Sequence, residues 1–191
     1  MGIDIHEGIE LWRPRMFNEW LALRPGSYHG GTGSNTASIV ANRLYATYLV
    51  IPRAVTVDRI GLTVYEAAEG AHLRLGIYRD DNLDAYPESL VLDAGVVGGD
   101  TTGEKTITID QHLPAGIYFL AFISDATPKL WLQADPRWRC PMGQVGTGIG
   151  YYGNVWQVNS QAYGVLPDPF PTGAASINDE WQIAVRVASV D

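Results

Sequence analysis

The stretch from Val55 to Ile123 decides the fold. It begins with VTVDRIGLTVYEA (55–67) and AHLRLGIYRD (71–80). It continues with SLVLDAGVV (89–97), GEKTITID (103–110) and AGIYFLAFIS (115–124). Each run is short, rich in Val, Ile, Leu, Thr and Tyr, and bounded by Gly, Pro, Asp or Asn. Short apolar runs spaced regularly between turn residues indicate antiparallel strands. The stretch therefore predicts an all-β fold, an antiparallel sandwich or barrel.

Alternation within these runs predicts which side chains share a face. In AHLRLGIY, Leu73, Leu75 and Ile77 fall on one face of a strand. In VTVDRIGLTV, we expect a kink or bulge at Gly61 to reset the alternation. A final run, EWQIAVRVASV (180–190), is expected to close the domain with one face formed by Trp181, Ile183, Val185 and Val187.

The N-terminal segment, residues 1–33, differs from the sandwich domain predicted for residues 34–191. Pro14 and Pro25 bracket a short stretch, Phe17–Leu23, with room for one or two helical turns at most, so this segment is predicted to be irregular or partly helical. The segment also carries large apolar side chains that need cover, either from the sandwich or from another protein. The candidate anchor or oligomer contacts are Leu11, Trp12, Met16, Phe17, Trp20 and Leu21.

Composition narrows the function classes. The 191 residues are 46% hydrophobic and 18% charged, the balance of a folded domain rather than a disordered chain. A net charge of -8 repels phosphate backbones, so no nucleic acid is expected as a partner. The single cysteine, Cys140, excludes an intrachain disulfide and a thiolate zinc site. We see no signal peptide and no apolar run long enough for membrane insertion, and we expect no cofactor.

Catalytic motifs give no support for an enzyme. The histidines are His6, His29, His72 and His112. No G-x-S-x-G motif or Cys-His signature accompanies them. Most acidic residues fall in turns or at strand ends, where Asp commonly binds backbone amides, so no glycosidase pair is predicted. Asp80, Asn82 and Asp84 imitate the start of a calcium loop, but its Gly and its final Glu are missing. A hairpin turn is the better interpretation, and no catalytic or metal-binding residue is predicted.

Aromatic residues gather in the loop-rich zone that follows residue 126. Flat rings with polar tips suit sugar stacking and protein interfaces, and they also fill cores under long loops. All three interpretations remain open for Tyr163, Phe170 and their neighbours. The candidate glycan-binding residues are Trp131, Trp138, Tyr151, Tyr152 and Trp156.

Six segments, taken in order, resemble a β-sandwich module that recurs in structural proteins of tailed bacteriophages. They are Tyr45–Pro52, Asp58–Val64, Leu73–Asp81, Tyr86–Gly95, Thr101–Ile109 and Leu113–Ala121. Typical pieces are LRLGIYRDD, YPESLVLDAG and LPAGIYFLA. Each piece alone is weak, and the specificity lies in the ordered set.

The resemblance implies a jelly-roll-like sandwich in a fibre, spike or decoration subunit of a virion, assembled in the host cytoplasm. Such modules are usually homotrimers, so a trimer is the first expectation. The implied partners are other virion proteins, reached through the N-terminal segment. The alternative function is a carbohydrate-binding module that recognises a host surface glycan through the aromatic loops of residues 131–170.

Overall fold

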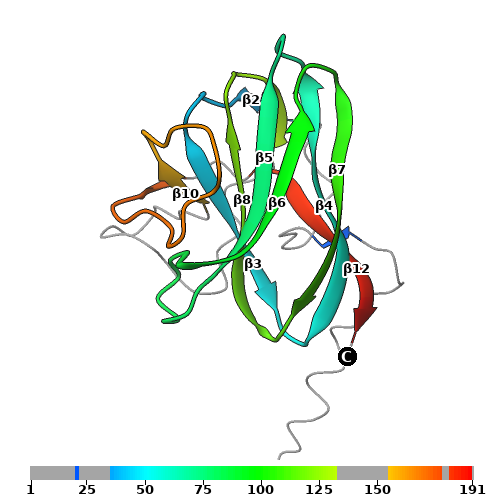
Figure 1. The fold of residues 1–191 in the computed structure, drawn as a ribbon, viewed down its shortest axis with the longest axis vertical. Coiled ribbons are helices and arrows are strands. Elements are labelled where there is room, and N and C mark those ends of the chain that lie inside the picture. Colours follow the sequence, from blue (N-terminus) through cyan, green and yellow to red (C-terminus); the bar gives the residue numbers. More distant parts are fainter. Residues whose placement is uncertain (1–19, 22–34, 133–154, 178–180, 191) are drawn as a thin grey trace, which may run out of the picture.

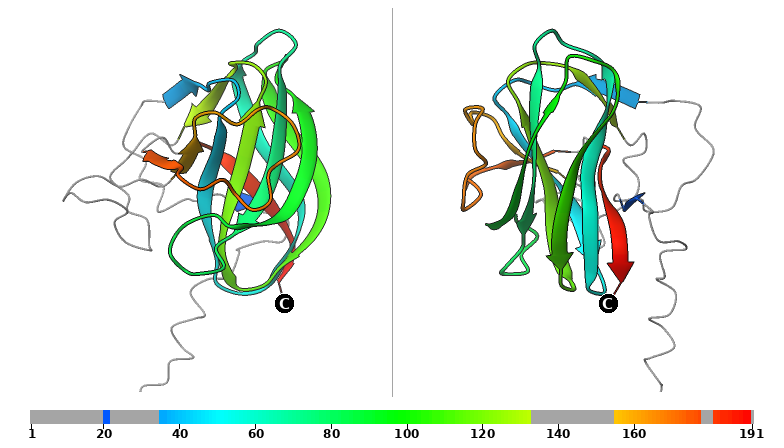
Figure 2. Two further views of the ribbon diagram at one scale, coloured as in Figure 1. Left: turned by 60° about the vertical axis from the view of Figure 1, so that its left-hand side comes forward. Right: turned by 45° about the vertical axis from the view of Figure 1, so that its right-hand side comes forward.

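The computed structural model of the chain describes residues 20–21, 35–132, 155–177 and 181–190. These residues form two antiparallel sheets of six strands each, packed face to face (Figures 1 and 2). The predicted β-sandwich is therefore confirmed. Within the described residues, no helix has the length and apolarity that a membrane-spanning helix needs.

The first sheet, sheet A, is organised around its long strand β4. Its strands are β1 (Trp20–Leu21), β12 (Ile183–Val190), β4 (Val55–Glu66), β7 (Gly103–Leu113), β9 (Lys129–Leu132) and β2 (Asn35–Ser38). β12 and β7 both pair with β4, and β9 pairs with the last residues of β4. β2 then pairs with β9 and extends this end of the sheet.

The second sheet, sheet B, has a simple order. In sequence across the sheet, its strands are β11 (Ala175–Ile177), β10 (Val155–Val158), β3 (Leu44–Ile51), β8 (Gly116–Ser124), β5 (His72–Arg79) and β6 (Ser89–Gly98). β3 and β8 pair along their full length and lie in the middle of the sheet. The chain crosses from sheet B to sheet A and back between β3, β4 and β5, so consecutive strands contribute to both sheets.

The main core lies between the two sheets, as the alternation predicted. Leu73, Leu75 and Ile77 are fully buried there, and so is the inward face of β12. An aromatic group fills one part of this core: Tyr45 stacks on Phe122 with ring centroids 5.0 Å apart, and Trp181 meets both rings edge-on. Such contacts add about 0.5–1.5 kcal/mol per pair beyond the burial of apolar area.

The alternation of β4 is reset earlier than predicted. The register with both neighbouring strands shifts between Val57 and Arg59, so the bulge lies at Asp58 and not at Gly61. The carboxylate of Asp58 then accepts two hydrogen bonds from Arg186 of β12. Gly61 serves close packing instead, because a Cβ there would lie 2.6 Å from a carbonyl oxygen of β7.

The N-terminal segment contributes a strand where an irregular or partly helical stretch was predicted. Trp20 and Leu21 form β1, which pairs with Arg186 and Val185 of β12. The prediction for Phe17–Leu23 is therefore wrong at these two residues, because the free edge of β12 offers their backbone groups a hydrogen-bonding partner. The remainder of residues 1–33 lies outside the described part of the chain.

Sheet B is apolar on both faces, which the sequence did not reveal. A second cluster of buried residues covers its outer face, with Ala46 and Phe119 among its strand members. Leu166 and Phe170 reach this cluster from residues 159–174, and Tyr86 reaches it from the β5–β6 loop. We call residues 80–88 and 159–174 the covering layer. Figure 2 shows residues 159–174, in orange, standing over the sheet as a third layer.

Candidate functional site

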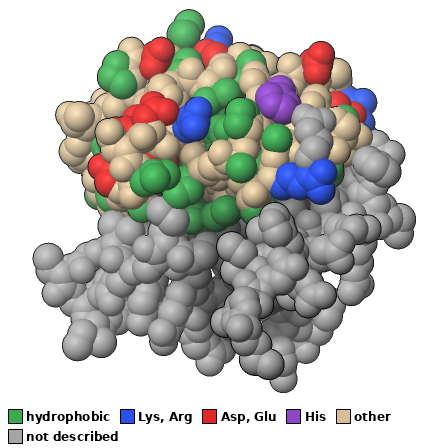
Figure 3. Space-filling view, turned by 90° about the horizontal axis from the view of Figure 1, so that it is seen from below, with side chains coloured by type: hydrophobic (Ala, Val, Ile, Leu, Met, Phe, Trp, Pro, Cys, Tyr) green, Lys and Arg blue, Asp and Glu red, His purple; other side chains and the backbone are tan. Residues whose placement is uncertain are grey.

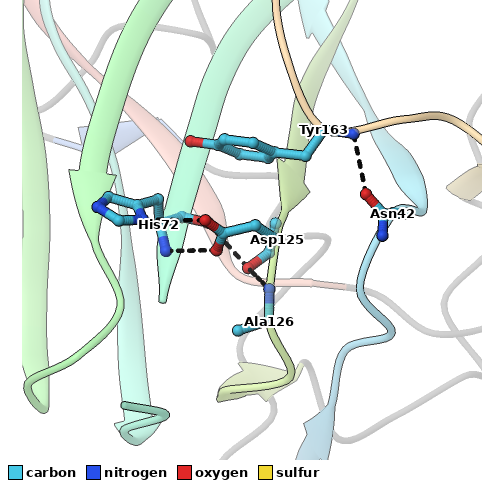
Figure 4. A network of polar contacts seen from close by, with 6 residues as sticks. Asn42, His72, Asp125, Ala126 and Tyr163 are labelled. Carbon is cyan, nitrogen blue, oxygen red and sulfur yellow. Dashed lines mark hydrogen bonds and ion pairs between the residues drawn. The ribbon is translucent and has the colours of Figure 1, made fainter. Parts of the chain in front are cut away.

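Polar side chains gather where β5 begins and β8 ends (Figure 4). The antiparallel pairing of these strands brings His72 next to Asp125, which directly follows β8. One carboxylate oxygen of Asp125 accepts the backbone N–H of His72 at 2.7 Å, and the other lies 2.9 Å from His72 Nδ1. Burial tends to raise the pKa of Asp125, but these bonds outweigh it and hold the pKa below 3.8. Asp125 is therefore a charged acceptor that fixes the ring of His72.

The covering layer is attached to the same region. Asn42, with a positive φ of 58°, turns its side chain so that Oδ1 accepts the N–H of Tyr163 at 2.9 Å. The ring of Tyr163 lies over Asp125 and His72 (Figure 4). Burial, followed by the negative charge of Asp125, raises the pKa of the Tyr163 hydroxyl. That hydroxyl therefore stays protonated and keeps its capacity to donate.

This cluster does not form a nucleophilic triad, although Ser, His and Asp are all present. The hydroxyl of Ser124 donates to the backbone carbonyl of His72 at 2.9 Å rather than to the ring. Ser124 is also fully buried, whereas a nucleophile must reach its substrate. The contacts hold the strand ends and the covering layer together, so His72 has a structural role here.

The calcium-like motif forms the β5–β6 hairpin connection, as the sequence indicated. Asp80 is buried, and its carboxylate accepts the N–H groups of Asp84 at 3.2 Å and Ala85 at 2.9 Å. Burial raises the pKa of Asp80 against the opposing effect of these amides. Glu88 accepts two further amides of the loop. Both carboxylates thus bind the loop's own backbone. Among the described residues, no three His, Cys, Asp or Glu side chains are grouped in a way that would hold a metal ion.

The candidate glycan residues do not form one site in the described structure. Trp131 lies in β9 of sheet A, where its ring meets Tyr65 edge-on. Trp156 lies in β10 of sheet B, half-buried in the second cluster, and its Nε1 donates to the carbonyl of Ala85 at 2.6 Å. The two rings therefore belong to opposite outer faces of the sandwich. The candidates outside the described residues are Trp138, Tyr151 and Tyr152.

The candidate anchor is described at two positions only. The side chain of Trp20 is 42% exposed and lies opposite Arg186 at the edge of sheet A. Leu21 lies opposite Val185 in the same ladder. The candidates outside the described residues are Leu11, Trp12, Met16 and Phe17.

Sequence reasoning missed Tyr65, which is 49% exposed beside Trp131. A usable signal was present. Leu62 and Val64 point into the core, so strict alternation would point Glu66 into the core as well. An acidic side chain is unfavourable there, so Glu66 indicates a second bulge in this strand. The structure has this irregularity between Val64 and Glu66.

The face of the described residues drawn in Figure 3 shows no concentration of a single charge. Seen from the end where β12 terminates, the described surface mixes acidic, basic and apolar side chains (Figure 3). Comparison with known proteins adds no identification: no family model matches this chain, and no curated protein matches it.

Proposed function

We propose that this chain is a non-enzymatic structural protein of a tailed-phage virion, a fibre, spike or decoration subunit displayed on the capsid or tail. One observation carries the proposal. The six segments that resemble the phage module overlap, in the same order, six consecutive strands, β3 to β8. These strands contribute to both sheets, so the resemblance spans the whole thickness of the sandwich and is not limited to one hairpin.

The packing of sheet B supports a role that requires a rigid domain which stays folded. Its central strands are buried on both faces by the chain itself. Tyr78 and Tyr86 donate to backbone carbonyls of the covering layer, at 2.7 and 2.6 Å. Because the chain has a single cysteine, no intrachain disulfide contributes to this rigidity. A domain with this close packing suits a particle surface, where a rigid fold must persist.

The N-terminal segment, residues 1–33, is the proposed attachment to the particle. Its described part, β1, occupies the edge of sheet A and leaves the Trp20 ring partly exposed. A strand at a sheet edge with an exposed aromatic ring is a common contact for another chain. The proposed homotrimer would also use this segment.

Particle composition tests the proposal directly. Particles of the virus that encodes this chain are purified by density and analysed by mass spectrometry and immunogold labelling. We expect peptides of the chain in the particles and gold on their surface. A chain that is abundant in the lysate but absent from the particles would overturn the assignment.

A truncation tests the attachment separately. Removal of residues 1–18 leaves β1 in place, so the sandwich should keep its circular dichroism spectrum and melting temperature. We expect the shortened chain to be lost from particles while it accumulates in the lysate. Incorporation at the normal level would exclude residues 1–18 as the anchor without affecting the virion assignment.

A further inference from the structure

One end of sheet A carries a pair of aromatic side chains that lies outside the main hydrophobic core. The rings of Tyr65 in β4 and Trp131 in β9 lie with centroids 5.3 Å apart and planes at 80°. They therefore form two nearly perpendicular walls. The pair lies at the end of the sandwich where β2 is labelled in Figure 1, opposite the end where β12 terminates.

A bulge places both Tyr65 and its neighbour on the outer face. Val64 pairs with Leu130 and Glu66 pairs with Lys129, so Tyr65 is the extra residue. Val64 and Leu130 are buried in the core, and alternation then directs Lys129 outward. Glu66, opposite Lys129, points outward as well, and its carboxylate forms an ion pair with the Lys129 ammonium. Two consecutive residues of β4 are thus turned to solvent, as a bulge allows.

The adjoining strand β2 adds hydroxyl groups to the same face. Ala37 packs against the core, so its neighbours Thr36 and Ser38 point to the outer side. They lie opposite Trp131 and Lys129 in the β2–β9 ladder. We call this outward surface the aromatic corner; its members are Thr36, Ser38, Tyr65, Glu66, Lys129 and Trp131.

We propose that the aromatic corner binds a neutral pyranose ring of a polysaccharide. A sugar ring presents an apolar C–H face and a rim of hydroxyls, and the corner offers the complementary groups. One aromatic ring can stack on the apolar face while the perpendicular ring borders its edge, and a carboxylate, an ammonium and two hydroxyls can bond the rim. Aromatic walls bury area at a low cost in conformational entropy, because each ring has only two rotatable bonds.

The charges of the aromatic corner and of the whole chain favour a neutral sugar over an acidic one. Glu66 and Lys129 neutralise each other, so the corner has no excess positive charge to attract an acidic glycan. The chain as a whole carries a net charge of -8, which repels uronic and sialic acids. A neutral glucan, mannan or galactan fits the corner better than a polyanion. A site of this size binds one ring weakly, and several copies displayed together would gain affinity through avidity.

The experiment uses the full chain, biotinylated at one terminus and assembled on streptavidin. It is applied to an array of glucans, mannans and galactans beside polyuronates and sialylated glycans. We expect binding to at least one neutral polysaccharide. Tyr65→Ala and Trp131→Ala should each weaken it by about tenfold or more, the loss typical of a truncated aromatic anchor.

Two further variants separate recognition from folding. Tyr65→Phe keeps the ring and should bind within about threefold of the parent. Val96→Ala, at an exposed position on β6 of the other sheet, should bind like the parent. The melting temperature of each variant shows whether it is folded, and Tyr65→Ala, at a half-exposed position, serves if Trp131→Ala does not fold.

Three results would overturn the inference: no binding to any neutral polysaccharide, binding to acidic glycans alone, or equal binding by parent and Tyr65→Ala. None of them bears on the virion assignment, which depends on particle composition. A positive result would equally hold for a protein that is not part of a particle.

Discussion

At the scale of single residues, Gly76 shows how tightly the covering layer meets sheet B. A Cβ at this position would lie 2.2 Å from Cδ1 of Leu166 and 2.6 Å from the carbonyl oxygen of Leu92. The leucine side chain can move aside, but the backbone carbonyl cannot. Gly76→Ala should therefore lower the free energy of unfolding by about 1–3 kcal/mol, the usual cost of overpacking.

Urea denaturation measures this effect, and Gly164 provides the matched control. A Cβ at Gly164 would meet no atom within 4 Å. Gly164→Ala should therefore change the free energy of unfolding by no more than about 0.5 kcal/mol, or raise it slightly. Equal effects of the two substitutions would show that Leu166 does not pack on β5 as described.

Asp58 supplies a pH-dependent contribution. Its carboxylate accepts Arg186 Nε at 2.8 Å and Nη2 at 2.5 Å. The hydrogen bond from Arg186 lowers the pKa of Asp58 below 3.8 against the opposing effect of burial. A lowered folded-state pKa stabilises the protein above the unfolded value, and this stabilisation is lost as the pH falls through the folded value.

Asp58→Asn should consequently reduce the free energy of unfolding at neutral pH and have a shrinking effect in acid. Denaturation of parent and variant is compared from about pH 7 down to about pH 2. The two curves should converge as the pH falls below 3.8, the ordinary value for Asp. A constant difference across the range would mean that the Arg186 bond contributes nothing that depends on charge.

At the scale of elements, the sequence predicted strands in both sheets, but alternation identified the inward face only of those strands whose two faces differ. β12 alternates and its inward residues are buried as expected, whereas β5 alternates only in its first half and is buried on both faces from Leu75 to Tyr78. β3 and β8 are buried on both faces, and the unbroken apolar run of β8 is typical of such a strand, but it does not identify the segment that covers the outer face. The covering residues 159–174 were interpreted as loop because Pro and Gly dominate there, although Leu166 and Phe170 are as buried as core residues.

The candidate site was less predictable, for a physical reason. The exact positions of the two bulges of β4 depend on how its partner strands are paired, although Glu66 gave a sequence signal for the second bulge. Trp131 was selected for its chemistry and lies at the aromatic corner, while its partner Tyr65 was hidden by the second bulge. Trp156 was selected by the same chemistry but fills the second cluster, because its neighbours in space come from the distant β5–β6 loop.

Phe170 tests whether residues 159–174 are a packed layer. Its ring is 2% exposed and meets the ring of Tyr78 edge-on at 5.0 Å. Phe170→Ala should cost about 3–5 kcal/mol where the cavity cannot collapse. It should also open residues 159–174 to thermolysin before the sandwich unfolds, which peptide mapping of the first cuts would detect.

Val165 is the control for this measurement, because its side chain is 72% exposed in the same segment. Val165→Ala should leave both the free energy of unfolding and the cleavage rate unchanged. If Phe170→Ala were cleaved no faster than Val165→Ala, the segment would not be held by its apolar contacts.

At the scale of the whole molecule, the open question is how many copies associate. The proposed fibre or spike subunit is expected to be a homotrimer, with a mass three times the 20.9 kDa of one chain. Light scattering of the purified protein at several concentrations measures this mass. A concentration-independent monomer would exclude the trimer and favour a decoration subunit within the same virion proposal.

Because sheet B is buried on both faces, the covering layer also determines how this protein is inactivated by heat. The strand from Gly116 to Ser124 contains nine residues and no charge, and its apolar side chains point to both sides. If the covering layer detaches first, the apolar outer face of this strand is exposed to neighbouring molecules while β3 and β5 still pair with its two edges, and a large exposed apolar face favours aggregation. Heat inactivation should then be irreversible, with a midpoint that moves with the scan rate. Shelf life would depend on how fast the covering layer opens and on protein concentration, more than on the equilibrium stability of the sandwich.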